Sequence, residues 1–245
     1  MSVIRLDEDL HVHSTFSDGA DTLEQNLAAA TAAGLRRLGC VDHVRRDTTY
    51  VPDYVRAVTT LRRATTIELT IGVEAKVLDA AGTLDVPAAL DGVDRVYVAD
   101  HQYPDGSGPV SPRAVRESLA SGGRDATIVI EGLVSALIAA MRRYSRDHRL
   151  VLAHLFSILP KMGLGESMVR DETVGRLVGA AADTGTVIEV SERWACPSAR
   201  VVAAALRHGV TVCASTDSHR ASDVGRYTYV AALAGEVEGH DAPAA

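Results

Sequence analysis

Two histidines and an aspartate stand close together in the segment DLHVHSTFSDG, residues 9–19. His11 and His13 are separated by one residue, so in an extended strand their side chains point to the same side and can bind one ion. Asp18 follows in a turn. Imidazole and carboxylate ligands together suit Zn²⁺, Mn²⁺ and Fe²⁺. This segment therefore predicts a metal site directly after an apolar strand.

Residues of the same types recur at the ends of later apolar runs. Six of the nine histidines lie on or just past such an end, and two further carboxylates, Glu74 and Asp217, lie there as well. The nine candidate ligands are His11, His13, Asp18, His43, Glu74, His101, His154, Asp217 and His219. Nine ligands are too many for one four-coordinate ion. They predict a cluster of two or three divalent ions that share a bridging carboxylate and a bridging water.

The elements that must position these ligands are short apolar runs rich in Val, Ile and Leu, each followed by a helix-like stretch. Apolar residues often run together in them, which is typical of parallel strands buried on both faces. The predicted strands are 9–13, 37–43, 68–77, 95–101, 149–154, 185–192 and 210–219. The predicted helices are 21–34, 52–64, 128–148, 173–185 and 199–209, and the first of them begins with Asp21 and Glu24 at capping-box spacing.

Seven strands alternating with helices predict an α/β fold with a single parallel barrel, one unit short of the usual eight. A doubly wound open sheet is the alternative. Active sites of parallel barrels form at the C-terminal ends of the strands, so ligands between residues 11 and 219 would meet in one mouth. No composition shift marks a domain boundary, and we expect one domain over 1–232. Residues 104–112 are predicted to form a Gly/Pro-rich loop and residues 233–245 a flexible tail.

Composition narrows the class of protein further. The 245 residues are 47% apolar and carry a net charge of -7, which argues against general binding to nucleic acid. Cys40, Cys196 and Cys213 are odd in number and widely spaced, so we expect reduced core thiols. The first ten residues lack the pattern of a signal peptide, and no apolar run approaches the roughly 20 residues that span a bilayer. These features predict a soluble cytoplasmic protein.

Seven short motifs in a fixed order resemble the PHP superfamily, which is named after polymerase and histidinol phosphatase. They are HVH (11–13), SDG (17–19), DH (42–43), GVE (72–74), DH (100–101), AH (153–154) and TDSH (216–219). The HxH pair alone also occurs in amidohydrolases, whereas the whole set at barrel spacing is far more specific. The resemblance runs from residue 9 to about residue 226. It implies a distorted (β/α)₇ TIM-like barrel and a metal-dependent phosphoesterase.

The resemblance also implies how the ligands are shared among the ions. A first ion would be held by His11, His13, Glu74 and Asp217. Glu74 would bridge to a second ion, which His101 and His154 complete. Asp18, His43 and His219 would hold the third ion. Asp18 occupies a position where some family members have histidine, so this third site is expected to be somewhat harder.

The expected reaction is hydrolysis of a phosphoester by a metal-bridged hydroxide, because bound ions lower the pKa of water and neutralise phosphate oxygens. Asp18 and His219 are candidates to protonate the leaving group. Arg193, Arg45 and Arg46 are candidates to bind the substrate, since a guanidinium matches phosphate bidentately. Trp194, the only tryptophan, is expected either to line the pocket or to pack against the barrel rim.

The expected substrate is a phosphomonoester of a small metabolite. The segment TDSHRASDVGRY (216–227) resembles histidinol-phosphatase-type members, whereas DHVRRDTTYVPDY (42–54) and ADHQYPDGSGP (99–109) do not, so another small phosphate ester is comparably favoured. The main alternative is a 3′–5′ exonuclease or nucleotide phosphodiesterase, disfavoured by the acidic balance. A non-catalytic metal-binding module is a weaker alternative, disfavoured by the complete ligand set. An amidohydrolase is weaker still, because no lysine stands at strand four.

Overall fold

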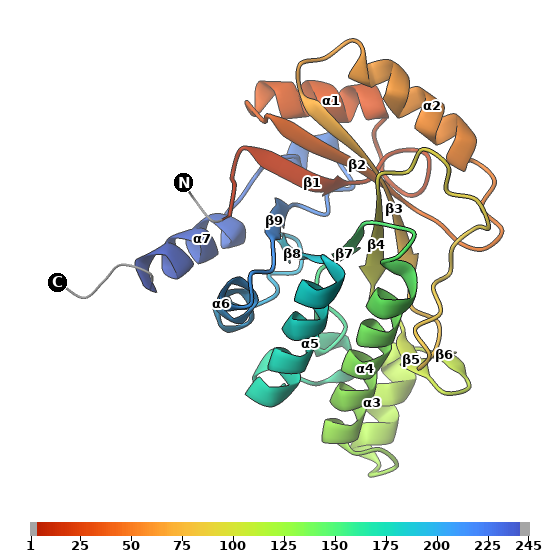
Figure 1. Ribbon diagram of the computed structural model, residues 1–245, viewed down its shortest axis with the longest axis vertical. Coiled ribbons are helices and arrows are strands. Elements are labelled where there is room, and N and C mark those ends of the chain that lie inside the picture. The colour runs from red at the N-terminus through yellow and green to blue at the C-terminus, as the bar shows by residue number, and fades with distance from the viewer. Residues whose placement is uncertain (1–3, 241–245) are drawn as a thin grey trace.

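Seven parallel strands curl into a nearly closed barrel in the computed structural model, which describes residues 4–240 (Figure 1). In spatial order the strands are β1 (Glu8–Val12), β2 (Arg37–His43), β3 (Glu68–Lys76), β4 (Arg95–Ala99), β7 (Leu150–Leu152), β8 (Val187–Ser191) and β9 (Val212–Ser215). The chain after β9 returns to β1, where the His13 N–H donates to the Ser218 carbonyl at 2.8 Å. This return confirms the predicted barrel and excludes the open sheet.

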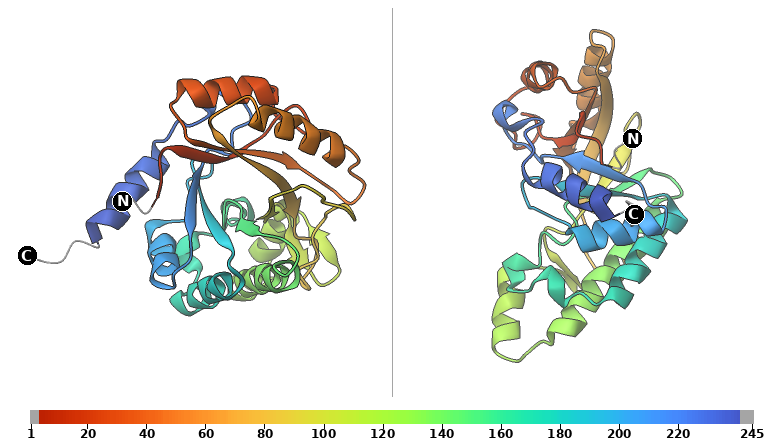
Figure 2. Two further views of the ribbon diagram at one scale, coloured as in Figure 1. Left: turned by 45° about the horizontal axis from the view of Figure 1, so that its top comes forward. Right: turned by 90° about the vertical axis from the view of Figure 1, so that its left-hand side faces the viewer.

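Helices surround the strands on the outside of the barrel (Figure 2). The five predicted helices are present as α1 (Leu23–Ala32), α2 (Val51–Arg62), α4 (Ala126–Tyr144), α5 (Asp171–Thr184) and α6 (Ala199–Arg207). The capping box of α1 lies one residue later than predicted. Thr22 accepts from the Gln25 N–H, and the Gln25 side chain accepts from the Thr22 N–H. A Thr hydroxyl suits this role as well as an Asp carboxylate does, so spacing alone did not distinguish the two.

Three segments differ from the sequence prediction. Residues 104–112 are not simply a loop, because β5 (Tyr103–Asp105) and β6 (Gly108–Val110) form a small antiparallel hairpin there. Helix α3 (Pro112–Ala120) follows it and was not predicted. The expected tail from 233 is instead part of helix α7 (Tyr229–His240), in which Leu233 and Val237 are buried. Residues 241–245 lie outside the described residues.

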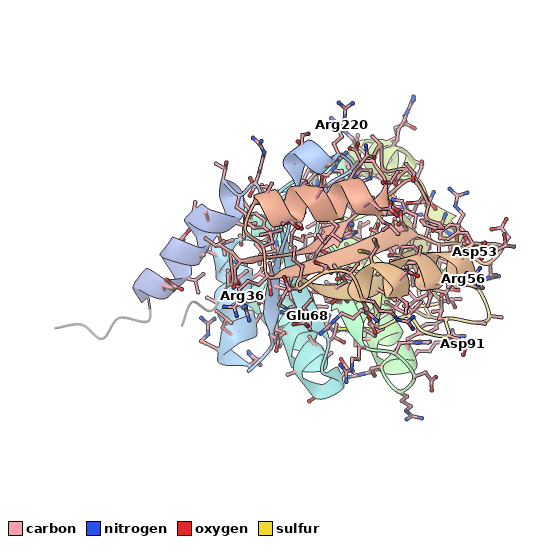
Figure 3. The ribbon with its side chains drawn as sticks, turned by 90° about the horizontal axis from the view of Figure 1, so that it is seen from above. Arg36, Asp53, Arg56, Glu68, Asp91 and Arg220 are labelled. Carbon is pink, nitrogen blue, oxygen red and sulfur yellow. The ribbon has the colours of Figure 1, made fainter. Side chains whose placement is uncertain are left out.

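Two apolar layers hold the barrel together. The larger lies between the strands and the surrounding helices, and the smaller fills the barrel interior with Leu10, Val41, Tyr97, Ala99, Val151, Ala153, Val187 and Cys213. All three cysteines are free and buried, as predicted. Exposed charges lie on the outside, where Figure 3 shows Asp53 and Arg56 on α2. No helix among residues 4–240 is long and apolar enough to cross a bilayer.

A bulge in β1 determines where the first two histidines point. Asp9 pairs with Leu38 and Val12 pairs with Cys40, so Leu10 and His11 together face the single residue Gly39. The extra residue lets both side chains enter the barrel, Leu10 into the interior layer and His11 into the mouth above it. The carbonyl of Leu10 is thereby free to accept a hydrogen bond from the buried Tyr97 hydroxyl.

Two glycines make room for this arrangement. A Cβ at Gly39 would stand 2.1 Å from the Leu10 carbonyl oxygen, and a Cβ at Gly72 would stand 2.7 Å from the Tyr97 ring. Both glycines are therefore required by close approach inside the barrel. The Tyr97 ring in turn lies 4.9 Å from the His11 ring, which couples the interior packing to the mouth.

We predict that Gly39→Ala lowers the free energy of unfolding by about 3 kcal/mol, since the clash is with backbone and must displace the bulge. Chemical denaturation followed by circular dichroism measures this. The matched control is Gly175→Ala on α5, where a Cβ meets nothing within 4 Å and stability should rise by about 0.5–1 kcal/mol. Equal stability of the Gly39 variant and the native protein would contradict the account of the bulge.

Candidate metal centre

The carboxylate of Glu74 lies at the centre of the barrel mouth and is surrounded by five imidazoles from four strand ends. Its Oε1 is 2.9 Å from His154 Nε2 and 3.0 Å from His101 Nε2. Its Oε2 is 2.9 Å from His43 Nδ1, 3.4 Å from His13 Nε2 and 3.5 Å from His11 Nε2. The two oxygens thus face two different sets of histidines, as a bridging ligand must.

Asp18 is the centre of a second, more exposed group. Its Oδ2 lies 3.4 Å from both His43 Nε2 and His219 Nε2, and its Oδ1 lies 3.6 Å from His13 Nδ1. The Asp18 side chain is 53% exposed, against 1% for Glu74. These residues are the third set that the family resemblance implied, with His13 in addition. Their exposure indicates a site that solvent reaches more easily than it reaches Glu74.

Asp217 completes the deepest group together with His11 and His13. Its Oδ1 lies 3.1 Å from His13 Nε2 and 4.0 Å from His11 Nε2. Asp217 has a φ of 51°, and His154, at the end of β7, has a φ of 33°. A left-handed backbone is uncommon for residues other than glycine and costs about 1–3 kcal/mol. Such strain is typical of functional sites, where it aims a side chain that a regular strand would turn away.

The distances between these atoms fit bound divalent ions. Two tetrahedral ligands about 2.1 Å from one ion are roughly 3.4 Å from each other, which matches the spacing around Asp18 and that between Glu74 Oε2 and the Nε2 atoms of His11 and His13. Three buried atoms that face one another, His11 Nε2, His13 Nε2 and Glu74 Oε2, have no hydrogen-bond partner among the described residues. Such buried polar atoms are costly unless something binds them. The donors are imidazole and carboxylate only, which suits Zn²⁺, Mn²⁺ or Fe²⁺.

The charge states of two of these side chains, His13 and Glu74, also suit metal ligands. Burial lowers the pKa of His13 to about 4, so its ring is neutral at pH 7 and keeps a lone pair. Burial alone would raise the pKa of Glu74, but the charge of His11 and the hydrogen bonds from the surrounding histidines hold it well below its usual range. The central carboxylate is therefore ionised and presents both of its oxygens as acceptors.

Buried carboxylates outside the ligand set hold the ligands in place, and the sequence analysis did not assign them this role. Glu189 Oε2 lies 2.8 Å from His11 Nδ1. Because a carboxylate only accepts, Nδ1 carries a proton, so Nε2 is the His11 atom that would bind an ion once it has given up its own proton. The alternating strand VIEVS already directs Glu189 into the barrel, where both residues are fully buried.

The aspartates of the two DH motifs act alike, each on a neighbouring loop. Asp42 accepts from the Ser14 N–H at 3.0 Å and from the Ser17 hydroxyl at 2.5 Å, which fixes the turn that carries Asp18. Asp100 accepts from the Phe156 N–H at 3.1 Å and the Ser157 hydroxyl at 2.9 Å, beside His154. Each DH pair thus supplies one candidate ligand and one positioning carboxylate.

The arginines predicted to bind substrate lie in three different places. Arg193 is exposed, with Nη1 3.5 Å from His219 Nδ1. Arg45 lines a cavity of about 520 Å³ whose wall also contains Asp18, His43, Glu74 and His101. Arg46, by contrast, does not reach the mouth. It lines a separate depression beside α4 and is not among the residues that line the cavity next to Glu74, so we do not propose it as a phosphate-binding residue.

An aromatic residue, Trp194, and a cationic residue, Lys161, complete the other side of the mouth. The Trp194 indole N–H donates to Asp217 Oδ2 at 2.6 Å, so Trp194 belongs to the site and not only to the rim packing. Lys161, in the 3₁₀ turn η1 (Pro160–Met162), lies over the Trp194 ring at 3.9 Å. Of the three histidines outside the ligand set, His208 is exposed and His148 partly exposed, while the side chain of His240 is outside the described ones.

A seven-stranded barrel with a buried carboxylate–imidazole cluster at the C-terminal strand ends defines a metal-dependent hydrolase of the TIM-like class. The model of the PHP domain matches residues 9–164, which is more than half of the chain. The chain therefore belongs to the PHP family. Fold, ligand types and family together are those of a metal-dependent phosphoesterase.

Similar proteins include a histidinol phosphate phosphatase from Lactococcus lactis, solved in complex with zinc, L-histidinol and phosphate. It is 14% identical, with a TM-score of 0.66 over 96% of this chain and 93% of that one. A phosphoribosyl 1,2-cyclic phosphate 1,2-diphosphodiesterase from Eggerthella lenta is 58% identical over 36 residues, 15% of this chain and 14% of that protein. A dihydropyrimidinase from Brevibacillus agri is 13% identical, with a TM-score of 0.45 over 86% of this chain and 57% of that one.

We predict that Glu189→Gln weakens Zn²⁺ or Mn²⁺ binding about 10–100-fold, because the amide no longer holds the His11 proton in place. Competition with a chromogenic chelator measures this affinity. Glu172→Gln on the exposed start of α5 is the matched control and should leave it unchanged. Equal affinity of both variants would show that Glu189 only packs the interior.

Proposed function

We propose that the protein hydrolyses a phosphomonoester of a small metabolite at two or three divalent ions held around Glu74. The observation that carries this proposal is the cavity of about 520 Å³, whose wall includes the candidate ligands Asp18, His43, Glu74 and His101. A cavity of this size suits a small organic molecule. It brings such a molecule directly to the bridging carboxylate.

The proposed ligands are the nine predicted ones, and the ions, when bound, would lower the pKa of a water molecule and neutralise phosphate oxygens. Arg193, next to His219, would bind the remaining phosphate oxygens with its guanidinium. Asp18 and His219 face one another at the exposed side of the mouth. When only two ions are bound and these two side chains are free of metal, either would hold the proton that the leaving oxygen requires, and the other would orient it.

The Lactococcus lactis enzyme supports a monoester substrate, because its fold covers nearly the whole chain and its complex contains phosphate and an alcohol product. Histidinol phosphate is therefore one candidate substrate. A polynucleotide is disfavoured by the net charge of -7, since an extended phosphate backbone requires a basic surface. The free, buried cysteines agree with the cytoplasmic location expected from the sequence, which stays a prediction.

A second candidate is hydrolysis of a small phosphodiester. The short segment of 58% identity with the Eggerthella lenta diphosphodiesterase favours it. A cyclic diester of a small sugar is compatible with the same cavity and the same ions. The segment covers 36 residues, so it supports the chemistry at the ions more than the choice of substrate.

Phosphate release after loading with Mn²⁺ or Zn²⁺ tests both candidates. The panel contains histidinol phosphate, sugar and nucleoside monophosphates, a cyclic sugar phosphate and a linear model diester. Our proposal predicts turnover of at least one monoester, with the diesters slower. Turnover of diesters alone would replace it with the second candidate. If no compound of the panel is hydrolysed although ions are bound, a non-catalytic module is favoured.

We predict that Arg193→Ala lowers kcat/KM for the best monoester about 10–100-fold, since a charged hydrogen bond to phosphate is lost. Steady-state kinetics and metal analysis of the same samples measure this. Arg46→Ala is the matched control, because that arginine lies outside the mouth, and its kcat/KM should be unchanged. Loss of bound metal in the Arg193 variant would instead make that residue structural.

A further inference from the structure

The cavity beside Glu74 carries two positive charges that the reaction at phosphorus does not need. Arg45 and Lys76 both line it, whereas Arg193 and His219 are not among its lining residues. The two carboxylates in the same wall, Asp18 and Glu74, are surrounded by histidines and are candidate ligands. The cavity therefore offers a cationic wall at a distance from the arginine proposed to bind the reacting phosphate.

Lys76 is positioned by its strand. It lies two residues after Glu74 on β3, so both side chains leave the strand on the same side and enter the mouth. Its Nζ is 3.7 Å from Asp85 Oδ2, and Asp85 is held by the Arg46 N–H at 2.9 Å. An ammonium has three donors, so this single neighbour orients Lys76 and leaves donors for a ligand.

Arg45 has a fixed backbone and an unengaged side chain. Its N–H donates to the Thr48 hydroxyl at 2.8 Å, and the Thr48 N–H donates back to the Arg45 carbonyl at 3.0 Å. Within residues 4–240 its guanidinium makes no hydrogen bond or ion pair. Two cations with one carboxylate, Asp85, leave a net positive charge on this wall, and the guanidinium is free to bind an anion bidentately.

We propose that Arg45 and Lys76 form a subsite for a second anionic group of the substrate, a carboxylate or a phosphate on its organic part. This inference rests on the proposed function for the reacting phosphate at the ions. It narrows the substrate class to phosphate esters that carry a second negative charge. It disfavours esters whose organic part is cationic, the candidate histidinol phosphate among them, because the wall would repel them.

Matched substrate pairs test this in the metal-loaded enzyme. 3-Phosphoglycerate differs from glycerol 3-phosphate by a carboxylate, and fructose 1,6-bisphosphate differs from fructose 6-phosphate by a phosphate. We expect kcat/KM to favour the doubly charged member of at least one pair about tenfold or more. The responsive pair identifies the anion. Lys76→Met should abolish that preference while the singly charged ester keeps its rate. Arg45→Met should also abolish the preference, and Arg46→Met should change neither quantity.

Binding without turnover separates this inference from the proposed function. Isothermal titration of the metal-loaded protein compares two pairs of phosphonates, 3-phosphonopropanoate with propylphosphonate and 1,3-propanediphosphonate with the same propylphosphonate. We expect at least one doubly charged phosphonate to bind about tenfold more tightly, and Lys76→Met to remove the difference. If this difference in affinity is found but no ester is hydrolysed, the subsite stands and the proposed function is overturned. Equal affinities would overturn the subsite, whatever the turnover.

Discussion

The buried carboxylate of Glu74 is the constraint on which the rest of the structure depends. An ionised carboxylate in an apolar interior is strongly unfavourable unless cationic or hydrogen-bonding groups surround it. Here five imidazole nitrogens lie within 3.5 Å of its two oxygens. Three of the buried atoms, His11 Nε2, His13 Nε2 and Glu74 Oε2, lack a hydrogen-bond partner among the described residues, so shared cations would stabilise the cluster. The barrel brings these side chains, which are far apart in the sequence, together at one end of the sheet.

The supports of this cluster lie in the layers directly below and beside it. Opposite Gly39, the bulge in β1 turns His11 into the mouth and frees the Leu10 carbonyl for Tyr97. Glu189 then fixes the tautomer of His11 from inside the barrel. Asp42 and Asp100 hold the loops that follow β1 and β7. Each support acts on a candidate ligand by orienting it, and the site has as many positioning carboxylates as candidate ligand carboxylates, three of each.

The sequence could predict the parts of this protein that repeat a pattern. Seven apolar runs and five helices were found within a few residues, because period and composition report burial directly. The candidate ligands were picked out because all but Asp18 lie at or near the end of a strand, and their role stays a prediction. The bulge could not be predicted, since one extra residue leaves no mark in composition. Helix α3 was missed because it is short and buries only Val115. The tail was misjudged because its many small residues give a weak apolar pattern, although Leu233, Ala234 and Val237 are buried there.

The residues of the site other than the candidate ligands could not be predicted reliably, because their positions depend on three-dimensional geometry that the sequence does not show. Lys76 could have been predicted from its two-residue spacing to Glu74. Nothing in the sequence, however, distinguishes Arg45, which lines the cavity, from Arg46, which lines another depression.

The most direct test of the proposed metal centre is anomalous diffraction from crystals of the Mn²⁺-loaded protein. The account predicts at least two Mn²⁺ peaks, one bound to each carboxylate oxygen of Glu74. Peaks only at surface carboxylates, or a single ion that leaves one oxygen of Glu74 bonded to histidines alone, would contradict it.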